Sequence, residues 1–199
     1  MSYLPVIPQT TVQTSEPSAE PVTLSEAKAH CRVTTDADDA LLSAYLITAR
    51  LHVEGIIERA LARRTFRTRM ARFPYDSALI VPCCPLVSVT TLKYYDVNNT
   101  QQTWDAANYV VLTDATPGMI ELANNVAWPD TTVRSDAVEI VYTAGYAVGS
   151  IDQRARHAIR LLVGHWYENR ESTTVGVEVK EIPQAVESLL WQLRTGVVR

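Results

Sequence analysis

Cysteine and histidine are the residues of this sequence whose side chains could form a catalytic or metal site. The chain has 199 residues with three cysteines and four histidines. Thiolate and imidazole are the ligands that zinc prefers, but none of these residues has the paired short spacing of a zinc module. Cys83 or Cys84 could act as a nucleophile only beside a base, and the sequence identifies none. We therefore predict no metal site and no catalytic residue.

Glycine-rich phosphate loops are also missing. The chain has only seven glycines, and they form neither the phosphate-loop nor the dinucleotide-binding pattern. The Gly-x-Ser-x-Gly turn of serine hydrolases and the His-Glu-x-x-His metal motif are absent as well. We expect a protein that is not an enzyme and that needs no cofactor.

A cluster of arginines is the sharpest charge feature. Its six members lie within fourteen residues that contain no acidic residue: Arg59, Arg63, Arg64, Arg67, Arg69 and Arg72. Guanidinium groups bind phosphates and carboxylates, so the cluster could contact DNA or an acidic neighbouring subunit. It could equally be a solvated helix end followed by a polar strand face, since Arg67 and Arg69 alternate. The net charge of -4 means that any DNA contact would be local.

Composition indicates one ordinary soluble domain. The chain is 47% hydrophobic and 20% charged, which is enough to form a substantial core. We identify no signal peptide and no run of about 18 apolar residues, so we expect synthesis in the cytoplasm and no membrane partner. The odd number of cysteines and the adjacent Cys83 and Cys84 argue against a disulfide framework.

Four helices must position these residues. Thr23 and Glu26 match a capping box and predict a helix over about 23–33. Apolar residues at helical spacing predict a long helix over about 38–62. A second capping-box pattern, Ser150 with Gln153, predicts a helix over about 151–170. Pro183 suits a first helical position and predicts a last helix over about 183–195.

Between the second and third helices, residues 65–145 have the pattern of an antiparallel sheet. Runs rich in β-branched and aromatic residues predict strands over 87–95, 109–112, 119–122 and 138–142. Asn98-Asn99 and Pro117-Gly118 are turn signals, and the second could form the hairpin between 109–112 and 119–122.

The predicted fold class is therefore α+β, a four-helix domain with an antiparallel β insert between helices 2 and 3. Residues 1–21 are rich in proline, serine and threonine and are expected to form an extended N-terminal arm. Residues 22–199 are expected to form a single domain that ends in a short tail, 196–199.

Four segments in a fixed order carry a family resemblance. Residues 21–28 read Pro-Val-Thr-Leu-Ser-Glu-Ala-Lys, and residues 141–146 read Val-Tyr-Thr-Ala-Gly-Tyr. The third helix ends in His-Trp-Tyr-Glu-Asn-Arg-Glu at 165–171, before Ile-Pro at 182–183. In this succession the chain resembles the head-tail connector (adaptor) family of long-tailed bacteriophages and phage-like gene-transfer particles over about residues 21–194.

The resemblance implies a structural role in the neck of a virion or phage-like particle. It implies a ring, twelve-fold in the mature particle, that continues the DNA channel between the portal protein and the stopper or tail-completion protein. DNA would pass through without sequence-specific contacts. The implied portal-binding residues are Leu190, Trp191, Leu193, Arg194, Val197 and Val198. Candidates for a subunit or DNA contact are Arg63, Arg64, Arg67, Arg69 and Arg72.

Two other functions remain open at this point. The first is a nucleic-acid-binding module that uses the cluster from Arg59 to Arg72. The second is a small cytosolic enzyme that depends on Cys83 or Cys84 together with a histidine.

Overall fold

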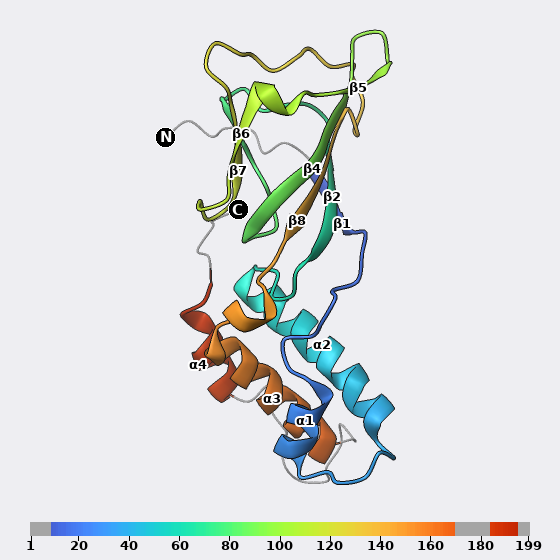
Figure 1. Ribbon diagram of the computed structural model, residues 1–199, viewed down its shortest axis with the longest axis vertical. Coiled ribbons are helices and arrows are strands. Elements are labelled where there is room, and N and C mark those ends of the chain that lie inside the picture. Colours follow the sequence, from blue (N-terminus) through green and yellow to red (C-terminus); the bar gives the residue numbers. More distant parts are fainter. Residues whose placement is uncertain (1–8, 170–183, 195–199) are drawn as a thin grey trace. The chain divides into compact units, whose positions relative to one another are not determined.

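The computed structural model describes residues 9–169 and 184–194, and these form two compact units (Figure 1). The helical unit combines Ser18–Ala62 with Tyr146–Arg199. The β unit combines Met1–Pro17 with Arg63–Gly145. Each unit is therefore built from two separate stretches of chain.

Four α-helices make up the described part of the helical unit. They are α1 (Leu24–Cys31), α2 (Asp39–Ile57), α3 (Gln153–Glu168) and α4 (Gln184–Trp191). A short 3-10 turn, η2 (Val148–Ser150), precedes α3. Together with the strands inserted between α2 and α3, they confirm the predicted α+β class.

The capping box of α1 is present as predicted. The Thr23 hydroxyl accepts from the Glu26 amide at 3.2 Å, and the Glu26 carboxylate accepts from the Thr23 amide at 2.9 Å. The two groups satisfy backbone donors that the first helical turn leaves free.

Helix α2 ends five residues before the predicted limit of 62, at Ile57. Glu58 adopts a left-handed conformation with φ 57°, which stops the helix. The Glu54 carboxylate then accepts hydrogen bonds from the amides of Leu61, at 2.7 Å, and Ala62, at 3.4 Å. The Glu54 carboxylate therefore stabilises the chain just after the end of α2, and the spacing of apolar residues in the sequence gives no sign of this contact.

The predicted capping box at the start of α3 was wrong. The N-cap is Asp152, whose carboxylate accepts from the Arg154 amide at 2.8 Å, and Ser150 lies in the preceding 3-10 turn. Asp152 is a favourable N-cap because its carboxylate accepts a backbone hydrogen bond and its negative charge also interacts well with the positive end of the helix dipole.

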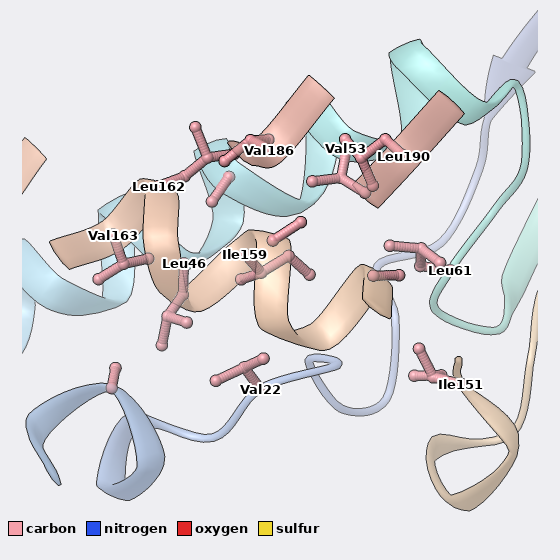
Figure 2. Packing of buried hydrophobic residues seen from close by; sticks show 14 of the residues in the cluster. Val22, Leu46, Val53, Leu61, Ile151, Ile159, Leu162, Val163, Val186 and Leu190 are labelled. Carbon is pink, nitrogen blue, oxygen red and sulfur yellow. The ribbon is translucent and has the colours of Figure 1, made fainter. Parts of the chain in front are cut away.

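The core of the helical unit lies between α2, α3 and α4. Figure 2 shows Leu46 and Val53 of α2 packed among side chains of α3 and α4, including Ile159 and Leu190. Val22, from the segment before α1, closes the same cluster. Burial of aliphatic side chains of this size contributes about 1.5–3 kcal/mol each.

The β unit contains a five-stranded antiparallel sheet in the order β1-β2-β8-β4-β5 (Figure 1). Its strands are β1 (Gln9–Gln13), β2 (Arg64–Met70), β8 (Val138–Ala144), β4 (Leu86–Tyr95) and β5 (Gln101–Thr103). Strand β2 alternates between buried and more exposed residues, as does β8, so one face of this sheet is buried and the other is more exposed.

A second, three-stranded sheet has the order β3-β7-β6, with β3 (Ala78–Ile80), β7 (Met119–Leu122) and β6 (Tyr109–Leu112). A 3-10 turn, η1 (Ala106–Asn108), precedes β6. Strands β6 and β7 pair antiparallel with Tyr109 opposite Leu122, which confirms the predicted hairpin.

Strand β1 was not expected, because its sequence is polar. It pairs with β2 in the register that places Thr11 opposite Thr68. The Thr11 and Thr68 hydroxyls are 2.8 Å apart, and the Thr68 hydroxyl is 3.2 Å from the buried Tyr142 hydroxyl on β8. A chain of hydroxyl contacts therefore ties part of the predicted arm to the sheet.

Candidate assembly surfaces

The predicted portal-binding residues differ in their exposure. Leu190 is fully buried in the helical core, and Leu193 packs against that core. Trp191, in contrast, is 72% exposed at the last position of α4. Val197 and Val198 lie outside the described residues. Within the described part, Trp191 is thus the apolar member of this set that is available to a partner.

Arg194 joins Trp191 in one small surface patch. Its guanidinium carbon lies 5.6 Å from the centre of the Trp191 ring, and Nη2 lies 3.8 Å from a Glu58 carboxylate oxygen. Both contacts hold the cation beside the indole. An exposed tryptophan beside an arginine has the composition of protein interface hot spots.

The arginine cluster is divided between the two units, and its members have different surroundings. Arg59 belongs to the helical unit, where Nη1 donates to the Tyr146 hydroxyl at 2.9 Å. Arg64 is buried with its guanidinium carbon 4.8 Å from the centre of the Phe66 ring. Two others also differ: Arg63 is exposed, and Arg72 stacks on the Tyr75 ring at 3.9 Å.

Arg67 and Arg69 do share the more exposed face of the five-stranded sheet. Both point toward Glu139 of β8, whose carboxylate is 2.8 Å from Nε of Arg69 and 4.0 Å from Nε of Arg67. Lys93 of β4 lies opposite Glu139 on its other side. Arg67, Arg69, Lys93 and Glu139 together carry a net charge of about +2, and Glu139 is already paired with Arg69. The positive electrostatic potential of this row is therefore modest.

The cysteines do not assemble with histidines in the β unit. Cys83 and Cys84 lie in this unit, whereas the sequence places all four histidines in the helical unit. Burial raises the pKa of Tyr142, near Cys83, so its phenol stays protonated and is no base for the thiol. Within the described residues, no group of three or more His, Cys, Asp or Glu side chains could hold a metal ion.

One braced surface of the β unit was not anticipated. Arg134 stacks on the Tyr95 ring, with 3.7 Å from its guanidinium carbon to the ring centre. It also donates to Asp136 at 2.6 Å and to Asn99 at 3.0 Å, which links the loop before β8 to the turn between β4 and β5. The Arg134 guanidinium holds the pKa of Asp136 below its usual value.

Two exposed valines lie close in sequence to the residues joined by Arg134: Val97 is in the turn, and Val133 precedes Arg134. The turn was predicted from Asn98-Asn99, and Asn99 has a positive φ of 59°, which asparagine tolerates. The partner loop had no such signal, because the cation-π and ion-pair contacts of Arg134 join residues far apart in sequence.

Comparison with known proteins gives one matching family. Residues 21–112 match the model of the phage gp6-like head-tail connector proteins. This segment includes α1, α2 and the strands β2 to β6. A comparison with curated proteins finds no match.

Solved structures match the fold over nearly the whole chain. A chain from the neck of an empty GTA particle, computed with C6 symmetry, matches with a TM-score of 0.77 and 25% identity, covering 96% of this chain and 97% of the other. A chain from the virion of a native gene transfer agent (GTA) particle matches with a TM-score of 0.75 and 25% identity, over 95% and 97%. A third, from the neck of a native GTA particle computed with C12 symmetry, has a TM-score of 0.74 at 22% identity, over 96% and 97%.

These findings confirm the predicted resemblance: residues 21–112 match the phage gp6-like head-tail connector proteins in sequence, and nearly the whole chain is similar in fold to chains from gene transfer agent particles.

Proposed function

We propose that this protein is a head-tail adaptor, which forms a ring between the portal and the stopper or tail and continues the DNA channel. The observation that carries the proposal is the fold match over 96% of the chain to a protein from the neck of a gene-transfer particle. Because both chains are matched almost end to end, the likeness extends to the whole connector and is not confined to one shared unit.

The ring follows from symmetry. The matched necks were computed with C6 and C12 symmetry, so the matched chains occur there in repeated copies. A cyclic assembly of identical chains needs two different faces on each copy that meet around the axis. We propose the same arrangement here, with twelve copies as the resemblance implies.

A scaffold role requires no bond-making chemistry. Within the β unit, which contains Cys83 and Cys84, there is no histidine that could act as a base for either thiol. Within the β unit, Arg64 is buried and Arg69 is paired with Glu139, so this unit offers no continuous arginine surface for a nucleic acid. DNA would therefore pass through the channel without a built recognition site.

Portal docking is assigned to the exposed end of α4. Trp191 and Arg194 present an aromatic anchor and a cation next to each other, while Leu190 and Leu193 hold the helix on the core. The two valines beyond them, Val197 and Val198, remain proposed contacts on the strength of the resemblance.

Co-sedimentation with portal-bearing, tailless heads tests the proposal. Deleting the chain from Ile182 onward would remove buried Val186 and Leu190 from the core, so point variants are the better probe. We expect saturable binding of the natural protein and at least about tenfold weaker binding of Trp191→Ala, as for an interface hot spot. Gln192→Ala, at the exposed neighbouring position, is the matched control. Equal sedimentation with heads that lack the portal would contradict the adaptor function.

A further inference from the structure

The charges of α2 are arranged opposite to those of an ordinary surface helix. After Asp39 at its first position, α2 has two charged residues, Arg50 and Glu54, and both are buried. They pair with each other at 3.1 Å, and Arg50 also pairs with Glu20 at 2.7 Å. A helix at the surface of a soluble protein normally turns such residues toward water. The outward face of α2 therefore carries no charge beyond its first turn.

Apolar side chains occupy that outward face instead. Ile47 is 44% exposed and Leu51, one turn later, is 51% exposed. The other exposed positions of the helix have small side chains: Ala40, Ala44, Thr48 and Gly55. Their spacing of three and four residues places all six on one stripe, about 22 Å long at 1.5 Å per residue. We call these six residues the α2 stripe.

Two details of the α2 stripe suit contact with protein better than contact with water. The Thr48 hydroxyl donates to the Ala44 carbonyl at 2.9 Å, so its hydrogen is already satisfied within the helix. A side chain added at Gly55 would meet no atom within 4 Å, so this chain's own packing does not require the glycine. Glycine inside a helix is unfavourable, which points to a need for close approach from outside.

The same pattern makes α2 long and apolar enough to pass for a membrane span by length and composition, although only 39% of that apolar window is buried. The inward half of α2 packs in the helical core, so the helix is not free to enter a bilayer. The exposed apolar face of α2 is the part that a protein partner would cover. Interface centres are depleted of charge in the same way.

We propose that the α2 stripe is the face through which each copy contacts a neighbouring copy in the ring. The inference rests on the proposed function, because a cyclic assembly gives every subunit two neighbours of its own kind. The stripe meets a different surface of the next copy, since contacts that repeat around an axis join unlike faces. Leu51 and Ile47 are the apolar anchors, and Gly55 lets the neighbour approach the helix backbone.

Site-specific photocrosslinking on assembled heads tests this contact. A photoreactive residue at Leu51 is compared with one at Ala29, an exposed position of α1 that lies outside the α2 stripe. We expect Leu51 to yield crosslinked dimers and larger multimers of this chain on portal-bearing heads, and Ala29 to yield none. Products joined to the portal protein alone would overturn the proposal, because α2 would then face the portal.

Substitution gives an independent test. Leu51→Glu replaces an exposed residue with a good helix former, so the isolated protein should keep its circular dichroism and thermal unfolding. Its binding to portal-bearing heads should weaken at least about tenfold, since a charge would be buried at each contact. Ala29→Glu is the matched control and should bind normally. Normal binding by a folded Leu51→Glu variant would overturn the α2 stripe proposal, whereas failure of the natural protein to bind would overturn the adaptor function itself.

Discussion

At the residue scale, the buried cation Arg50 is the strongest single test of the helical unit. Its guanidinium pairs with the carboxylates of Glu20 and Glu54 at 2.7 and 3.1 Å. Arg50→Met would leave these acids without their cation, and we expect the free energy of unfolding to fall by about 3–5 kcal/mol. Leu51→Met, at the exposed next position, should change it by less than about 0.5 kcal/mol. Denaturant titration of both variants measures the difference, and equal midpoints would contradict this role for Arg50.

Glu26 gives a pH-dependent test at the same scale. Hydrogen bonding from the Thr23 amide, together with Arg156, holds the pKa of Glu26 below its usual value of 4.5. Because the folded-state pKa is the lower one, this stabilisation is present above about pH 4.5 and is lost as the pH falls through the folded-state pKa.

We expect Glu26→Gln to be less stable than the natural protein at neutral pH by about 0.5–1 kcal/mol. The difference should shrink as the pH falls below about 4.5 and disappear below the lowered folded-state pKa, where Glu26 is itself protonated. Thermal unfolding measured from pH 7 to pH 3 checks this, and a constant difference over that range would show that the carboxylate charge is not responsible.

At the element scale, the surroundings of two glycines predict that replacement by alanine has opposite effects on the stability of the protein. A side chain at Gly55 in α2 meets open space, so Gly55→Ala should stabilise the isolated protein by about 0.5–1 kcal/mol. A Cβ at Gly118, before β7, would lie 2.3 Å from Cβ of Leu86, so Gly118→Ala should destabilise it by about 1–3 kcal/mol. Each variant serves as the control for the other in a melting experiment. The same sign for both would contradict the packing described here.

The elements also show which features were predictable from sequence. The hairpin of β6 and β7 was found because local turn residues separate two β-rich runs. Strand β1 was missed because its residues are polar and its partner β2 lies more than 50 residues later in the sequence. The end of α2 was misplaced because a side-chain acceptor within the helix, Glu54, determines it. Residues close together in the sequence were enough to predict local structure, whereas contacts between segments far apart in the sequence became known only from the structure.

The candidate surfaces follow the same rule. The α4 residues were predicted as a group, but only the fold separates buried Leu190 from exposed Trp191. The α2 stripe could not be predicted from the sequence, because the hydropathy of an apolar helix does not show which of its sides is buried.

At the scale of the whole molecule, the proposed role of this protein is that of a passive part of a particle neck. Its family match and its fold match to neck proteins carry that conclusion. The proposed adaptor would act only by being present, because it would join the portal to the tail without changing either chemically. Loss of the protein should therefore stop assembly at one defined stage.

The most direct measurement is electron microscopy of particles made by cells that lack this protein. We expect portal-bearing heads without tails. Added purified protein should restore tail joining, whereas Leu190→Ala, which opens a cavity in the helical core, should restore it poorly. Complete tailed particles in the absence of this chain would contradict the head-tail adaptor function.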